Sequence, residues 1–107
     1  MPEIPGKIKN ILKEYLNNLS NEINIKSAIL FGSYATGNQK ADSDVDIAIF
    51  SDYFSLIDRT EAIAFLLDKT LEYNIDLQPL AFESKDLENY HDNHFVSEIV
   101  NCGIRIM

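Results

Sequence analysis

Two short apolar runs, residues 27–31 and 45–50, constrain the fold of this chain more than any other feature of its sequence. Each run is short and is bounded by glycine or polar residues, which is typical of a buried strand. The first run ends at Gly32, and the second begins between two aspartates, Asp44 and Asp46. We therefore expect two core strands, joined by a polar loop or short helix.

Apolar residues at helical spacing flank these runs. The first pattern predicts an amphipathic helix over roughly residues 5–23, with Pro5 tolerated in its first turn. The second begins at residues 55–58, which have the form of a capping box, and predicts a helix that ends near residues 73–74. Its apolar stripe would consist of Leu56, Ile63, Leu66, Leu67 and Leu71.

The rest of the chain predicts one more strand and one more helical stretch before a short final strand. Residues 75–82 read as a strand, and Pro79, which has no N–H to donate, indicates an edge or a bulge. Ser84 can cap a helical stretch that ends at Gly103, with Phe95, Val96, Ile99 and Val100 on one face, and residues 104–106 follow as a strand. This order predicts an α/β (α+β) fold, a small mixed sheet with helices packed on one face.

Length and composition suit a single compact domain over residues 1–107, with a hydrophobic fraction of 46%. No apolar run approaches the roughly 20 residues that span a bilayer, and the N-terminus has no apolar segment typical of a secretory signal. The single cysteine, Cys102, excludes an internal disulfide and is expected to be a small buried residue. The cytoplasm is the simplest setting for such a chain.

The charge pattern narrows the partners. The formal net charge is −8, and the nine Lys and Arg residues form no basic run. Binding to a phosphate backbone needs a basic patch, so this composition argues against nucleic acid as a large substrate. An acidic surface favours a basic protein partner or bound cations.

Three carboxylates are placed so that they can meet at one end of the sheet. Side chains alternate across a strand, so Asp44 and Asp46 point to one side, as do Asp76 and Gln78 on the later strand. If the two strands are neighbours, the three aspartates converge, and such a cluster cannot stay fully charged cheaply without a cation. Mg²⁺ fits because it prefers hard oxygen ligands and substrate phosphates. Asp42 is interpreted as a turn residue.

The turn after the first strand supplies a second kind of group. Gly32 and Ser33 lead out of the strand, and a turn that enters a helix presents backbone N–H groups. Glycine lets a phosphate approach the backbone closely, and Ser33 adds a hydroxyl donor. Either signal alone is weak, whereas their combination is specific.

These residues resemble the signature of the DNA polymerase beta-like nucleotidyltransferase superfamily, Gly32-Ser33 followed by ten residues and then Asp44-Val45-Asp46. The longer motif around it, Gly-Ser-Tyr-Ala-Thr-Gly followed by Asp-Ser-Asp-Val-Asp-Ile-Ala, is similar to the motif of the minimal nucleotidyltransferase (MNT) branch of this superfamily. The third family carboxylate matches Asp76, and residues 98–104 are similar to that branch's last helix. The resemblance covers most of the chain from about residue 27.

The resemblance implies roles for these residues. Gly32 and Ser33 would hold the triphosphate of the nucleotide, and Asp44 and Asp46 would bind Mg²⁺. Asp76 would complete the metal site and help to deprotonate the acceptor hydroxyl. Two metal ions in such a site stabilise the attacking and leaving oxygens.

One position departs from the pattern. Many MNT sequences have Arg where this chain has Thr36, so a cationic partner for the triphosphate is missing. Lys40 could substitute for it, although Lys does not match the fixed geometry of Arg.

The resemblance also implies a function. Larger nucleotidyltransferases carry a helical domain for which this chain has no residues, and MNT proteins commonly pair with a HEPN-domain toxin. The expected activity is transfer of AMP from ATP to a hydroxyl, a tyrosine, of that HEPN ribonuclease toxin, which would silence it. Two alternatives stay open: an inactive antitoxin that acts by binding alone, and a transferase for a small molecule such as an aminoglycoside that works as a homodimer.

Overall fold

The computed structural model describes residues 4–40 and 43–107, so Asp42 lies outside the described residues. Within these residues helices and strands alternate as far as the third strand, and two helices separated by a short 3-10 helix then precede the last strand. In chain order they are α1 (Gly6–Ser20), β1 (Ile25–Phe31), α2 (Ser33–Thr36), β2 (Val45–Ser51), η1 (Asp52–Ser55), α3 (Arg59–Asp68), β3 (Leu77–Phe82), α4 (Ser84–Glu88), η2 (Tyr90–Asp92), α5 (His94–Cys102) and β4 (Ile104–Arg105).

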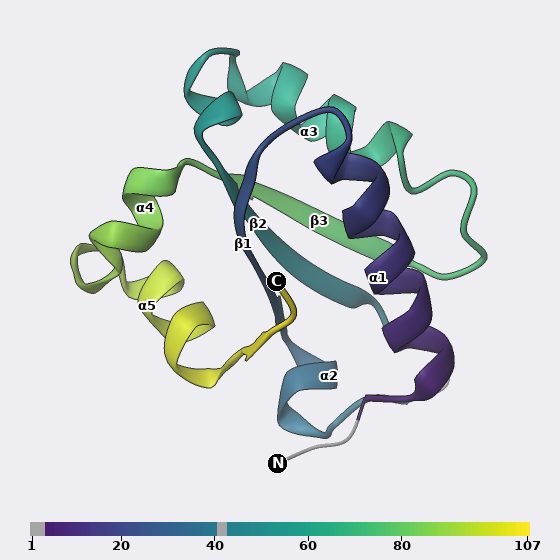
Figure 1. Ribbon diagram of the computed structural model, residues 1–107. Coiled ribbons are helices and arrows are strands. Elements are labelled where there is room, and N and C mark those ends of the chain that lie inside the picture. Colours follow the sequence, from purple (N-terminus) through teal and green to yellow (C-terminus); the bar gives the residue numbers. More distant parts are fainter. Residues whose placement is uncertain (1–3, 41–42) are drawn as a thin grey trace.

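The four strands form one mixed sheet in the order β3-β2-β1-β4 (Figure 1). Strand β1 is antiparallel to β2 and to β4, whereas β2 and β3 are parallel. The predicted edge position of Pro79 is confirmed, because β3 is the outer strand and has β2 as its neighbour. A proline is tolerated there since no further strand needs its missing N–H.

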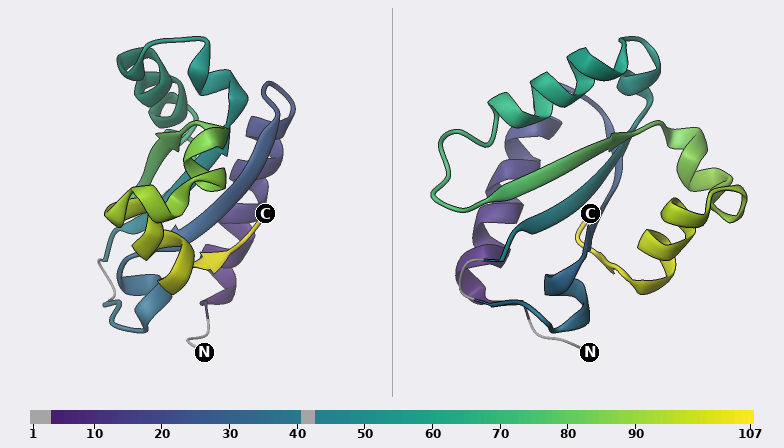
Figure 2. Two further views of the ribbon diagram at one scale, coloured as in Figure 1. Left: turned by 90° about the vertical axis from the view of Figure 1, so that its left-hand side faces the viewer. Right: turned by 180° about the vertical axis from the view of Figure 1, so that it is seen from behind.

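Helices cover both faces of this sheet. On one face α1 and α3 enclose the larger core cluster, in which Leu12, Leu30 and Ile47 are fully buried. On the other face α5 packs Val96 and Ile99 against Ala48 and its neighbours. Figure 2 (left) shows α1 and α5 on opposite sides of the strands. The α/β class with a mixed sheet is confirmed, and the structure adds a second helical layer to the one that was expected.

The predicted start of the second long helix is wrong. Ser55 does not cap a helix, because its hydroxyl donates to the carbonyl of Asp52, 2.7 Å away, inside the 3-10 helix η1. Asp58 caps α3 instead, and its carboxylate accepts from the N–H of Glu61 at 2.9 Å. The competing signal was present three residues further on, since Asp58 and Glu61 also have capping-box spacing.

The helix also ends earlier than predicted, at Asp68, and its expected apolar stripe is only partly buried. Leu66 is fully buried, but Leu56 and Leu71 are 78% and 80% exposed because they lie outside the helix. Ala62, a small residue that the stripe omitted, lies in the core instead. No helix among the described residues is long and apolar enough to cross a membrane.

Strand β3 begins two residues later than predicted. The N–H of Leu77 donates to the carbonyl of Ile75 at 3.0 Å, and such a three-residue turn interrupts extended pairing. Asp76 therefore precedes the strand, although its carbonyl still accepts from the N–H of Val45 at 2.8 Å. The first helix is also shorter than predicted, Gly6–Ser20.

Gly103 ends α5, as predicted, but for a reason other than a left-handed turn. Its φ is −81°, a value that any residue can adopt. A Cβ at this position would lie 2.5 Å from Cγ2 of Ile29 and 2.8 Å from the carbonyl oxygen of Leu30. Glycine is therefore required because β4 and the end of α5 approach β1 so closely.

Gly103→Ala should destabilise the fold by about 1–3 kcal/mol, the usual cost of forcing a carbon into a packed site. Gly6→Ala is the matched control, because a Cβ there would meet nothing within 4 Å. Urea unfolding followed by circular dichroism measures both. Equal midpoints for the two variants would show that the close approach at Gly103 is unimportant.

Candidate active site

The turn after β1 brings the backbone against an aspartate. Gly32 has a φ of 74° and a ψ of −150°, a conformation that L side chains rarely adopt. A Cβ on Gly32 would overlap a carboxylate oxygen of Asp46. The carbonyl of Gly32 accepts from Ala35 at 3.1 Å and from Thr36 at 3.2 Å, which closes the short helix α2 onto the turn. The Gly32–Ser33 turn and the Asp46 carboxylate thus form one continuous surface.

Asp46 occupies the centre of this end of the sheet. It pairs with Phe31 of β1 on one side and with Gln78 of β3 on the other. Alternation along β2 places it on the same face as Ala48, the face that α5 covers further along the strand. Val45, which points to the opposite face, is buried in the larger core cluster.

Asp44 and Asp76 flank Asp46 at the entrance to β2 and β3. The two carboxyl groups lie close enough for their side chains to interact directly. Gln78 Nε2 also donates to Asp76 Oδ1 at 2.5 Å. The structure therefore brings all three predicted aspartates together, along with the glutamine that the strand pattern placed on the same face.

Their pKa values show how these like charges affect one another. Burial, and then the negative charge of Asp76, raise the pKa of Asp46. The hydrogen bond from Asp44, and then that from Gln78, lower the pKa of Asp76. The site thus favours charge at Asp76 and opposes it at Asp46, as expected when carboxylates share a small space.

The donor set suits a hard cation that also binds phosphate. Within residues 4–40 and 43–107, no three acidic, imidazole or thiol side chains are grouped so that they could hold a metal ion. Mg²⁺ does not need such a cage, because it commonly binds through one or two carboxylates together with substrate phosphates and water. The crowded carboxylates of Asp44, Asp46 and Asp76, adjacent to a turn that phosphate can approach, fit that mode.

A pocket also lies beside Gly32. It is an apolar pocket of about 250 Å³ between α2 and α5, and its lining includes Phe31, Thr36 and Phe95. The sequence did not predict this pocket, because Phe95 was assigned to the core face of its helix, yet its side chain is 48% exposed. Its ring meets Phe31 edge-on, with centroids 6.0 Å apart. Cys102, expected to be buried, is exposed and also lines the pocket.

Thr36, the residue that replaces the usual arginine, is oriented toward the backbone. Its hydroxyl lies 3.4 Å from the carbonyl oxygens of both Gly32 and Ser33, and it accepts from Asn38 at 3.1 Å. Lys40 is exposed in the loop that follows, and its N–H donates to Ser43 Oγ at 2.6 Å.

A mixed sheet that carries a Gly-Ser turn beside clustered carboxylates defines a nucleotidyltransferase. The family described as Polymerase beta, Nucleotidyltransferase matches residues 7–107. The chain belongs to this family.

Known proteins similar to this chain agree with the assignment. Two relatives from Methanocaldococcus jannaschii are named as putative protein adenylyltransferases, MJ0141 and MJ0126. The first is 29% identical over 94% of this chain and 99% of its own length, and the second is 39% identical over 67% and 74%. Two solved structures share the fold. A nucleotidyltransferase structure from Sulfolobus solfataricus has a TM-score of 0.65 at 14% identity, covering 77% of this chain and 72% of its own. A toxin-antitoxin structure with AMP-PNP has a TM-score of 0.62 at 23% identity, covering 92% and 72%.

The raised pKa of Asp46 predicts a pH-dependent penalty on folding in EDTA. A carboxyl group whose folded pKa exceeds its unfolded pKa binds more protons when folded, so stability falls as the pH rises from about 3.9 through the folded value. Asp46→Asn should therefore be at least as stable as wild type at neutral pH, and its advantage should shrink toward about pH 4.

Urea midpoints across this pH range measure the effect, and Asp92→Asn, an exposed aspartate outside the site, is the matched control. An Asp46→Asn protein that is less stable than wild type at neutral pH would show that the charge stabilises the fold.

Proposed function

We propose that this chain is a Mg²⁺-dependent protein adenylyltransferase that transfers AMP from ATP to a tyrosine hydroxyl of a HEPN ribonuclease toxin and so neutralises it. One observation carries the proposal: the Gly32–Ser33 turn lies directly against the carboxylate of Asp46, with Asp44 and Asp76 beside it. Phosphate binding and carboxylate chemistry are thus available within one site. The names of the relatives and the toxin-antitoxin neighbour support the choice of a protein acceptor.

Each residue of the site has a role in the proposed reaction. The backbone at Gly32 and the hydroxyl of Ser33 hold the β- and γ-phosphates. Asp44 and Asp46 would hold Mg²⁺ together with the phosphates, with Asp76 completing the edge of the metal site, and the ion would neutralise charge on the phosphates and on the attacking and leaving oxygens.

Asp76 is the residue suited to receive a proton. Its side chain is exposed, so an incoming hydroxyl can reach it. The acceptor oxygen forms a bond to the α-phosphorus while the bond from that phosphorus to the bridging oxygen breaks. Pyrophosphate leaves, and the hydroxyl proton passes to Asp76 and then to solvent.

Binding without transfer is the second candidate, and Thr36 is the observation that favours it. The hydroxyl of Thr36 lies near backbone carbonyls, and a neutral threonine cannot offset the charge of a triphosphate as arginine does. Nucleotide binding and transfer therefore need separate measurements.

Nucleotide binding is tested by melting. With Mg²⁺ and ATP at a hundredfold excess over the dissociation constant, wild type should gain about 2.7 kcal/mol of stability. Asp44→Asn/Asp46→Asn should gain much less, because it lacks two of the cation's ligands. ATP with EDTA is the control. Equal gains in the two proteins, or none in either, would contradict the proposed site.

Transfer is tested by intact mass. Wild-type protein with ATP and Mg²⁺ should add AMP to a co-expressed HEPN-domain toxin, and Ser33→Ala should slow the reaction. Gly32→Val should abolish it, because the side chain would displace Asp46 and block the approach of phosphate. A toxin that binds the chain and is silenced without a change in mass would establish the binding-only candidate. AMP found on a small molecule instead would leave the site intact and replace the acceptor.

A further inference from the structure

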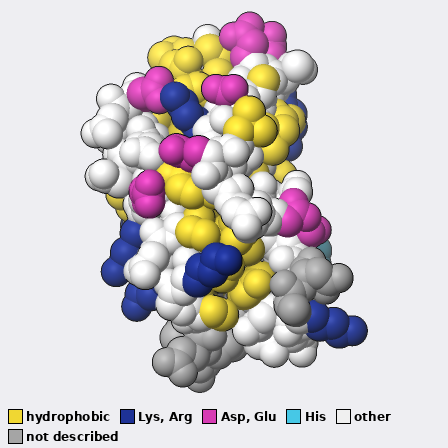
Figure 3. Space-filling view, turned by 90° about the vertical axis from the view of Figure 1, so that its right-hand side faces the viewer, with side chains coloured by type: hydrophobic (Ala, Val, Ile, Leu, Met, Phe, Trp, Pro, Cys, Tyr) yellow, Lys and Arg dark blue, Asp and Glu magenta, His cyan; other side chains and the backbone are white. Residues whose placement is uncertain are grey.

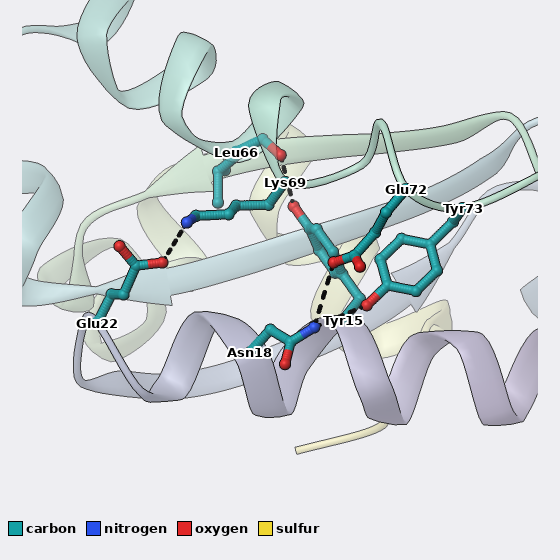
Figure 4. Close-up of polar contacts among 7 residues, drawn as sticks. All are labelled: Tyr15, Asn18, Glu22, Leu66, Lys69, Glu72 and Tyr73. Atoms are coloured by element: carbon teal, nitrogen blue, oxygen red, sulfur yellow. Dashed lines mark hydrogen bonds and ion pairs between the residues drawn. The ribbon is translucent and has the colours of Figure 1, made fainter.

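The segment that delivers Asp76 to the site has no regular structure of its own. It runs from Lys69, after the end of α3, to Asp76, just before β3. An irregular segment opens more easily than a helix or strand unless side chains elsewhere hold it. Three of its side chains reach across to helix α1 and to the turn that follows it (Figure 4).

Asn18 of α1 makes the central contact. Its Nδ2 donates to Oε1 of Glu72 at 3.3 Å and to the hydroxyl oxygen of Tyr73 at 2.9 Å. An amide NH₂ has two hydrogens, so it can serve both acceptors at once, which a hydroxyl or a carboxylate cannot do. Lys69 forms an ion pair with Glu22, which lies in the turn just after the end of α1.

Tyr15 completes the contact from the buried side. It is fully buried, and its hydroxyl donates to the carbonyl of Leu66 in α3 at 2.9 Å. Its ring meets the ring of Tyr73 edge-on, with centroids 6.1 Å apart. Tyr15 and Asn18 are three residues apart, so they lie on one face of α1, and Glu22 follows just after the helix ends. This face therefore holds both the end of α3 and the segment that follows it.

The far end of the segment is the catalytic end. Tyr73 lies three residues before Asp76, whose carbonyl accepts from Val45 at 2.8 Å and whose carboxylate lies beside Asp44. Because β3 is the outer strand, no strand beyond it helps to fix this end. Figure 3, which looks onto the side of the molecule that carries α1, shows acidic side chains spread among exposed apolar ones.

We propose that Asn18 and Tyr73 are positioning residues, which together form a clasp that holds Asp76 in place for the transfer step. This inference rests on the proposed role of Asp76 and adds a requirement outside the acidic site. The phosphate turn belongs to β1 and α2, on the other side of Asp46. Loss of the clasp should therefore lower the rate of transfer with little change in the use of ATP.

The first test measures hydrogen exchange by NMR in the full chain without nucleotide. In Asn18→Ala and Tyr73→Phe, the amide of Val45 should exchange about fivefold to tenfold faster, as expected when one net hydrogen bond is lost. The amide of Ala28, which bonds to the carbonyl of Met107 near the opposite edge of the sheet, should not change. Asn17→Ala, the same substitution at the exposed neighbouring position of α1, is the matched control and should alter neither amide.

The second test measures transfer of AMP to the HEPN-domain toxin over a range of ATP concentrations, with Mg²⁺ in excess. Asn18→Ala should lower kcat about tenfold while KM for ATP changes less than about twofold, because the substitution acts through the position of Asp76. Tyr73→Phe keeps the ring contact with Tyr15 and should show a smaller loss. Asn17→Ala should match wild type.

Three results would overturn the proposal: an unchanged rate at Val45, a parallel increase at Val45 and Ala28, or a faster Val45 with an unchanged kcat. The second of these would mean that the variants loosen the whole fold. If wild type transfers no AMP, the proposed function fails, and the exchange rates at Val45 and Ala28 then decide by themselves whether the clasp holds Asp76.

Discussion

The contact between Gly32 and the Asp46 carboxylate sets the geometry on which the rest of the site depends. The turn cannot carry a side chain, because a Cβ would overlap the carboxylate and because its backbone has a positive φ. This absence of a side chain brings two chemically different groups together, a backbone that a phosphate can approach and a carboxylate that repels it. A cation between them would offset the repulsion between phosphate and carboxylate, since it is attracted to both of these anions. The local structure therefore favours a nucleotide bound with Mg²⁺ over either ligand alone.

Because side chains alternate along a strand, the residues of β2 that build the core and the carboxylate of the site point to opposite faces of the sheet. Val45, Ile47 and Ile49 of β2 point into the core under α1 and α3 and are almost completely buried. Asp46 lies between Val45 and Ile47 in the chain but points to the other face. The carboxylates on this face repel one another, and the apolar packing on the opposite face keeps the strand in place despite that repulsion. Such a strand tolerates a costly carboxylate because its neighbours along the chain contribute most of its stability.

The same alternation explains which features the sequence could predict. The two central strands follow from local periodicity and the edge position of Pro79 from its missing N–H, and the structure agrees with both. The start of α3 was missed because two capping-box sequences compete within a few residues, and only Asp58 bonds to the backbone N–H of a following helix. Local patterns could not choose between them.

The clasp and the apolar pocket beside Gly32 could not be predicted for a different reason. Asn18 contacts Glu72 and Tyr73 across 54 and 55 positions of sequence, and spacing on α1 gives no sign of those partners. Phe95 fits the apolar stripe of its helix, but it lines the pocket beside Gly32 and is 48% exposed. Long-range pairs of this kind depend on how elements pack, which periodicity within one element does not report.

Helix α1 thus contributes to the site although it carries none of the residues that would touch the nucleotide. Its apolar face builds the core through Leu12, Leu16 and Leu19, and its adjoining polar face holds the segment before β3. A substitution on the apolar face would act through the stability of the whole fold, whereas one at Asn18 would act on a single segment. An edge strand needs such external support, because it lacks the second neighbour that fixes a central strand. The outer position of β3, which leaves Asp76 exposed, is therefore also the reason why we propose that α1 holds it.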